Sequence, residues 1–140
     1  MIELRDVWRT YTLGGEALHA LAGVNETIEP GEHVAIMGPS GSGKSTLLNV
    51  IGCLDRPSAG SYLLEGVDTG SLDDDELSRL RGRQLSFVFQ AYHLVARLTA
   101  IQNVELPLLL AGVSRGERRE RALAALTAVG LADRVEHRPS

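Results

Sequence analysis

The sequence predicts an α/β fold, in which strands and helices alternate along the chain. Residues 33–37 form a short apolar run, which is typical of a strand buried on both faces. A glycine-rich turn follows at residues 38–45, and after it the apolar residues recur at helical spacing. Together these observations predict a strand, turn and helix unit at the centre of the fold.

The chain before this unit predicts two strands. Apolar residues alternate with charged ones over residues 2–7, which is typical of a half-buried strand. Residues 20–28 alternate more weakly and end at a Pro-Gly turn signal, residues 30–31. In the central unit, the helix at residues 46–54 has one apolar stripe, formed by Leu47, Leu48, Ile51 and Leu54.

The chain after this unit predicts two further strands and one helix. Residues 61–65 favour a strand that follows a loop, and residues 85–89 favour a second buried strand ending at Gln90. Between them, residues 71–76 predict the start of a helix. Its exposed amides can be capped by the Ser71 hydroxyl or by an early aspartate, and the acidic residues that follow suit the positive end of the helix dipole.

The last part of the chain predicts two helices. Residues 99–110 have a mostly helical apolar pattern, in which Pro107 kinks or ends a turn. Residues 114–129 place Glu117 four residues before Arg121 and present one apolar stripe, and Gly130 is placed to end this helix.

Composition narrows the classes of function. The chain has 140 residues, 44% of them hydrophobic, and a net charge of -4, which does not favour binding to nucleic acid. The single cysteine, Cys53, cannot form an internal disulfide, and no Cys/His cluster has metal-binding spacing. The N-terminus lacks the apolar segment of a signal peptide, and the most apolar stretch, residues 104–113, is too short to span a membrane. We therefore expect a cytoplasmic protein.

Lys44 is the only lysine, since 13 of the 14 basic residues are arginine. Lysine carries a compact, flexible ammonium, whereas arginine carries a planar fork. A lysine kept in a chain that otherwise uses arginine indicates chemistry at this position that needs an ammonium.

The segment around Lys44 matches the phosphate-binding pattern G-x-x-x-x-G-K-[ST] over residues 38–45, and the predicted strand and helix flank it as that pattern requires. Its glycines allow backbone turns in which consecutive amides point at an anion, and the start of the helix adds partial positive charge. Lys44 can follow the β- and γ-phosphates, and the Ser45 hydroxyl can ligate Mg²⁺. The segment therefore predicts binding of a nucleoside triphosphate with magnesium.

The residues quoted so far, in their order and spacing, resemble the ATP-binding subunit of ABC transporters, and within that family the branch of lipoprotein release and macrolide export. The resemblance covers essentially the whole chain and rests on residues 2–7, 36–47, 87–90 and 98–107. It implies a P-loop NTPase-type core sheet with an N-terminal antiparallel β subdomain (residues 1–90 together) and the start of a helical subdomain (residues 91–140), truncated before the second half of the domain.

The resemblance also implies roles for individual residues. Tyr11 matches the aromatic residue that stacks on adenine, and Gln90 matches the glutamine that reaches Mg²⁺ and the attacking water. Lys44 and Gln90 are then the catalytic candidates, and Ser45 and Gln90 the metal ligands. From the residues alone, Tyr11 could also pack at a strand end, and Gln90 could be a solvated loop residue. The implied nucleotide site consists of Tyr11, Gly38, Pro39, Ser40, Gly41, Ser42, Gly43, Lys44, Ser45 and Thr46.

Three motifs that hydrolysis in this family requires are not found in these residues: the signature helix start, the Asp-Glu pair after an apolar strand, and the downstream histidine. The first hypothesis is therefore an ATP-binding subunit that powers export or lipoprotein release, present here as its N-terminal part. The alternatives are a non-hydrolysing ATP-binding module and a kinase-like P-loop enzyme. The resemblance implies a membrane permease and a second nucleotide-binding subunit as partners, and a location on the inner face of the cell membrane.

Overall fold

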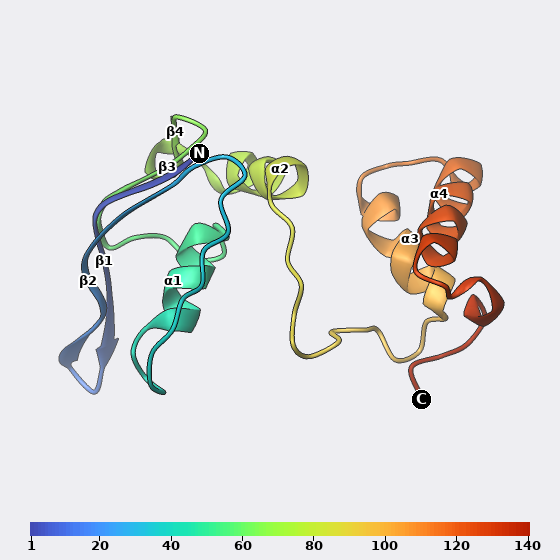
Figure 1. The fold of residues 1–140 in the computed structure, drawn as a ribbon, viewed down its shortest axis with the longest axis horizontal. Coiled ribbons are helices and arrows are strands. Elements are labelled where there is room, and N and C mark those ends of the chain that lie inside the picture. The colour runs from blue at the N-terminus through green and yellow to red at the C-terminus, as the bar shows by residue number, and fades with distance from the viewer. The chain divides into compact units, whose positions relative to one another are not determined.

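The computed structural model describes residues 1–140, which divide into two compact units, Met1–Val88 and Phe89–Ser140 (Figure 1). The first unit contains a sheet, two α-helices and the glycine-rich loop. The second contains two α-helices. Each unit has an apolar core of its own.

The sheet of the first unit is antiparallel throughout, which confirms the implied antiparallel β subdomain. Its strands are β1 (Ile2–Leu13), β2 (Glu16–Ile28), β3 (Ala59–Leu64) and β4 (Val67–Asp68), in the order β2-β1-β3-β4. β1 and β2 are longer than their apolar patterns predicted, because they form one hairpin that continues to the turn at residues 14–15. This extension brings Tyr11 into the sheet, opposite Leu18.

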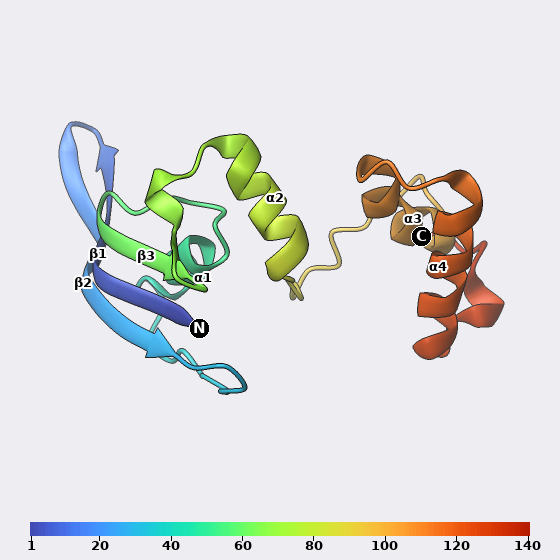
Figure 2. The same cartoon turned by 90° about the horizontal axis from the view of Figure 1, so that it is seen from above.

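Two helices, α1 (Lys44–Ile51) and α2 (Asp74–Gln84), contribute to the core of this unit (Figure 2). The buried residues come from three strands, from both helices and from the turn after α1. They are Leu4, Val7, Leu21, Val50, Cys53, Tyr62, Leu64 and Leu77. The Tyr62 hydroxyl donates to the Ile51 carbonyl at 2.7 Å, so β3 also holds the C-terminal end of α1.

Capping explains where the second helix begins. Of the two predicted caps for α2, the structure uses an aspartate: Asp73 accepts from the Glu76 amide at 2.8 Å, and Glu76 accepts from the Asp73 amide at 2.9 Å. The Ser71 hydroxyl instead donates to the Asp68 carbonyl at 2.7 Å. The two hydrogen bonds between Asp73 and Glu76 form a capping box, which satisfies two amides at the start of α2.

The predicted buried strands at residues 33–37 and 85–89 are wrong. Both segments lie outside the sheet. Val34 and Met37 are 47% and 88% exposed, and Val88 is fully exposed at 101%. An apolar run indicates a tendency to be buried, but a strand also needs a neighbouring strand for its backbone hydrogen bonds. Here the sheet consists of β2, β1, β3 and β4, and neither segment pairs with any of these strands.

The second unit pairs α3 (Ala100–Leu110) with α4 (Arg115–Ala128) around Ile101, Ala122 and Leu126. Thr99 and Ser114 cap the two helices, and Pro107 lies inside α3, which continues to Leu110. None of the helices in residues 1–140 has both the length and the apolar character that crossing a bilayer requires.

Candidate functional site

The glycine-rich loop, residues 38–45, leads into α1 from residues 32–37, which belong to no helix or strand. Gly43 is the N-cap of this helix and has a φ of 87°, a left-handed conformation that side chains rarely adopt. A Cβ at Gly43 would also collide with the Ala20 carbonyl oxygen of β2. Glycine at this position therefore lets the loop turn sharply while it lies directly against β2.

The start of α1 offers backbone amides to an anion. Its first intrahelical hydrogen bond runs from the Leu47 amide to the Gly43 carbonyl at 2.8 Å. The amides of Lys44, Ser45 and Thr46 precede that bond, so the helix itself provides them with no acceptor. Amides in this position, together with the helix dipole, favour a bound phosphate.

Lys44 places a positive charge at the same loop. Its Nζ donates to the carbonyl oxygens of Gly38 and Pro39 at 2.9 and 2.6 Å. An ammonium has three donors, so one remains for a further acceptor while these two bonds hold the side chain over the loop. An anion at the loop would thus meet the amides of α1 and the ammonium together.

A cavity of about 380 Å³ lies between this loop and the hairpin of β1 and β2. Tyr11 forms part of its wall, as do most of the loop residues predicted from the sequence. Gly38, Pro39 and Ser42 belong to the loop but do not line the cavity. The lining residues are Tyr11, Leu18, His19, Ala20, Ser40, Gly41, Gly43, Lys44, Ser45 and Thr46.

Three of these lining residues, Leu18, His19 and Ala20 of β2, were missed by the sequence analysis. They reach the site because the hairpin places Leu18 opposite Tyr11 and because Ala20 lies against Gly43. The His19 Nδ1 lies 2.9 Å from the Thr10 hydroxyl, so the imidazole is also tied to β1. The signal that could have found them is the pair of glycines at residues 14–15, which sets the register of the hairpin.

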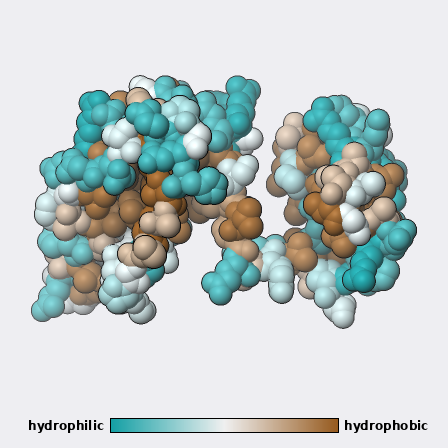
Figure 3. Space-filling view, in the orientation of Figure 1, coloured by the Kyte–Doolittle hydropathy of each residue, from teal (hydrophilic) through white to brown (hydrophobic).

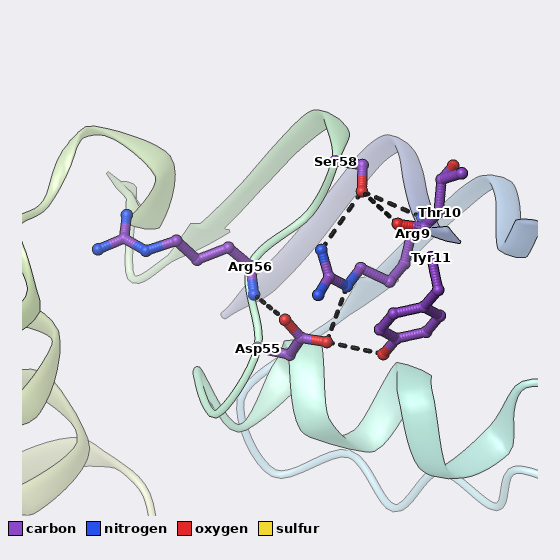
Figure 4. Close-up of polar contacts among 6 residues, drawn as sticks. All are labelled: Arg9, Thr10, Tyr11, Asp55, Arg56 and Ser58. Atoms are coloured by element: carbon purple, nitrogen blue, oxygen red, sulfur yellow. Dashed lines mark hydrogen bonds and ion pairs between the residues drawn. The ribbon is translucent and has the colours of Figure 1, made fainter. Parts of the chain in front are cut away.

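Tyr11 is held by a polar cluster beside the cavity, shown in Figure 4. Its hydroxyl donates to Asp55 Oδ2 at 2.8 Å, and Arg9 Nε donates to the same oxygen at 2.8 Å. The Arg9 guanidinium carbon lies 4.5 Å from the centre of the Tyr11 ring, within cation–π range. Arg9 and Asp55 were also missed by the sequence analysis. Asp55 lies 44 positions from Tyr11 in the chain, so no local pattern relates the two residues.

The cluster keeps the Asp55 carboxylate charged. Burial alone would raise the pKa of Asp55, but hydrogen bonds from Tyr11, from the Arg56 amide and from Arg9 outweigh it and lower the pKa below its ordinary value. Nearby, burial raises the pKa of the Cys53 thiol. Asp55 is therefore an anion at neutral pH, and Cys53 is a protonated thiol.

The residues at the loop fit a magnesium ion that is held mainly by its ligand. Nowhere in residues 1–140 do three or more His, Cys, Asp or Glu side chains come together as a metal site. Mg²⁺ in nucleotide sites takes one or two protein oxygens and otherwise phosphates and water, and the Ser45 hydroxyl at the cavity is such an oxygen. Gln90, the other predicted ligand, is an exposed residue of the second unit.

Comparisons with known proteins match the chain to one family. The family model described as ABC transporter matches residues 21–140. A macrolide export ATP-binding/permease protein MacB from Bordetella avium is 52% identical over 99% of the chain and 21% of its own length. An uncharacterized ABC transporter ATP-binding protein from Thermotoga maritima is 51% identical over the whole chain and 60% of its own length.

A solved structure shows the same fold. The ATP-binding cassette MJ0796, described as dimeric, in a post-hydrolysis state and bound to ADP and Pi, superposes with a TM-score of 0.88 at 48% identity. The match covers 99% of this chain and 62% of that one. The chain thus spans between about a fifth and three fifths of the length of these similar proteins.

Proposed function

Because this chain belongs to the ABC transporter family, we propose that its loop and cavity bind Mg-ATP to power transport through a membrane permease. The observation that carries the proposal is the arrangement of Lys44 and the unbonded amides of α1 at one end of a cavity whose wall includes Tyr11. Such a site has a positive end for the triphosphate and an aromatic side chain for the base.

Each part of the site has a separate role in this proposal. The amides of α1 and the Lys44 ammonium bind the β- and γ-phosphates and neutralise their charge. Ser45 and Gln90 would hold the magnesium ion, which would supply positive charge to the phosphates. Gln90 also orients the attacking water, and Tyr11 stacks on adenine.

The similar proteins suggest how nucleotide binding is used. MacB is named as a macrolide export ATP-binding/permease protein, and MJ0796 is described as dimeric with ADP and Pi. We extend both descriptions to this chain: it serves an export system or lipoprotein release, pairs with a second nucleotide-binding subunit, and lies on the inner face of the membrane. The segment at residues 91–110 would contact the permease.

The proposal is tested by calorimetry of Mg-ATP binding to the wild-type chain and to Lys44→Ala. We expect Lys44→Ala to weaken binding at least about tenfold, because a hydrogen bond to a charged group contributes about 1.5–3 kcal/mol. The matched control is Arg79→Ala, which removes an exposed positive charge from α2 of the same unit and should leave affinity unchanged. Equal affinities of wild type and Lys44→Ala, or no binding by the folded wild type, would contradict the proposal.

A further inference from the structure

We propose that Asp55, which lies shortly after the C-terminal end of α1, is a positioning residue for nucleotide recognition. It holds the Tyr11 ring at the cavity. This inference rests on the proposed function, because it assigns Asp55 a role through the residue that would stack on the base. It concerns the nucleoside part of the ligand and leaves the triphosphate to the loop.

The geometry ties Tyr11 at both ends. Its backbone belongs to β1, and its hydroxyl donates to Asp55 Oδ2 at 2.8 Å (Figure 4). Asp55 is itself fixed, because its Oδ1 accepts from the Arg56 amide at 2.9 Å and its own amide donates to the Asn49 carbonyl of α1 at 3.2 Å. A tyrosine anchored at both ends keeps one ring orientation, which lowers the entropy lost when a base stacks on it.

Arg9 completes the arrangement from one side of the ring. Its guanidinium donates to Asp55 Oδ2 and lies over the Tyr11 ring, 4.5 Å from the centre. A face covered by a guanidinium is closed to a base, so the ring has one face left for stacking. Asp55 thus orients the Tyr11 hydroxyl directly. It also holds the Arg9 guanidinium that covers one face of the Tyr11 ring.

The same helix then determines where both parts of the nucleotide bind. Lys44 is the first residue of α1, and Asp55 follows the last residue of α1 by four positions. The phosphate-binding amides and the anchor of the aromatic ring therefore belong to one rigid element with its adjoining turn. A change at Asp55 should release the ring without altering the phosphate-binding loop.

A positioning role for Asp55 and a role in stability alone predict different losses of binding. If Asp55 only stabilised the turn after α1, its removal would weaken ATP and inorganic tripolyphosphate binding alike. If it positions Tyr11, the loss should be confined to ATP, and Tyr11→Phe, which removes only the hydroxyl, should reproduce it. The two changes should also be non-additive, since both remove the same hydrogen bond.

The experiment measures binding of Mg-ATP and of magnesium tripolyphosphate by calorimetry to five forms of the whole chain: wild type, Asp55→Ala, Tyr11→Phe, the double variant and Asp55→Asn. We expect Asp55→Ala and Tyr11→Phe each to weaken ATP binding about three- to tenfold, the range that corresponds to one net hydrogen bond. Tripolyphosphate binding should stay within about twofold of wild type. The loss of ATP affinity in the double variant should not exceed the larger of the two single-variant losses. Asp55→Asn retains an acceptor for the hydroxyl and should recover part of the loss.

The matched control is Asp74→Ala, which breaks the neighbouring ion pair with Arg56, 2.9 Å long, at a carboxylate that is 97% exposed. Both affinities should remain at the wild-type value in this variant. Should Asp55→Ala fail to fold, as checked by thermal unfolding, Tyr11→Phe alone decides the question.

Three outcomes would overturn the inference: equal losses for ATP and tripolyphosphate, unchanged ATP affinity in Tyr11→Phe and Asp55→Ala, or additive losses in the double variant. In each of these the wild type still binds Mg-ATP and the proposed function stands. Failure of the folded wild type to bind either ligand is a different result, and it would overturn the proposed function as well.

Discussion

Asp55 shows how the surroundings of a single side chain set its charge and its purpose. Its carboxylate is about one fifth exposed and accepts hydrogen bonds from Tyr11, Arg9 and the Arg56 amide. These donors favour the charged form, and they outweigh the burial that opposes it. A residue with no obvious role in the sequence therefore becomes the centre of a hydrogen-bonded cluster beside the cavity.

The lowered pKa of Asp55 predicts an acid-dependent part of stability. Because the folded pKa lies below the ordinary value of 3.8, the unfolded chain binds this proton more tightly. The stabilisation from Asp55 is complete well above 3.8 and is lost as the pH falls through the folded pKa. We expect the difference in unfolding free energy between wild type and Asp55→Asn to be constant from about pH 8 to 6 and to shrink below about pH 4.

Urea unfolding at several pH values measures this difference. Asp74→Asn is the control, since its ion pair is exposed and should contribute little at any pH. A difference between wild type and Asp55→Asn that stays the same down to about pH 2 would show that the charge of Asp55 does not contribute.

At the scale of elements, side chains at helix starts determine where α2, α3 and α4 begin. Asp73 and Thr99 form complete capping boxes, and Ser114 caps α4.

Asn103, inside α3, binds the segment that precedes the helix. Its Oδ1 accepts from the Val95 amide at 2.8 Å, and its Nδ2 lies 3.0 to 3.3 Å from the carbonyl oxygens of Val95, Leu98 and Thr99. It thereby ties residues 95–99 to the first turn of α3.

Asn103→Ala should loosen this segment, because the Val95 amide and the three carbonyls lose their side-chain partner together. We expect the free energy of unfolding to fall by about 1–3 kcal/mol and amide exchange to speed up at residues 95–99. Glu105→Ala, at a polar residue of the same helix, is the control and should change exchange in this segment little. Unchanged exchange at residues 95–99 in Asn103→Ala would show that other contacts hold the segment.

At the scale of the whole molecule, the chain has two cores. Val50, Tyr62 and their neighbours form the first, and Ile101, Ala122 and Leu126 form the second. Apolar side chains remain exposed in both units, among them Met37 in the first and Tyr92 in the second, each 88% exposed. The space-filling view shows apolar surface on both units (Figure 3). Because the two cores have no residue in common, a mutation can destabilise each of them separately.

Ile101→Ala should destabilise the second unit selectively. Ile101 is 1% exposed, and truncating a fully buried isoleucine costs about 2–5 kcal/mol. Hydrogen exchange followed by mass spectrometry should show faster exchange in residues 89–140 and wild-type protection in residues 1–88. Val50→Ala is the reciprocal variant and should affect residues 1–88. Equal loss of protection in both units after either change would mean that they unfold as one.

Local signals in the sequence predicted the glycine-rich loop, the helix after it, the aspartate cap of α2 and the two terminal helices. Glycine conformations, capping residues and helical periodicity act between residues a few positions apart, so a sequence window contains all the interacting groups. The same reasoning failed at residues 33–37 and 85–89, where the apolar pattern predicted strands and the structure has none. The roles of Gln90 and of the loop residues toward a nucleotide stay predictions.

By itself, the sequence determined the phosphate-binding pattern, the sole lysine within it and the helix that follows it. Only the tertiary structure decided that Leu18, His19 and Ala20 share a cavity with the loop, and that Asp55 anchors Tyr11. The physical reason is the range of the interactions. A hairpin register and a hydrogen bond between residues 44 positions apart depend on how whole elements pack, and no local propensity encodes that distance.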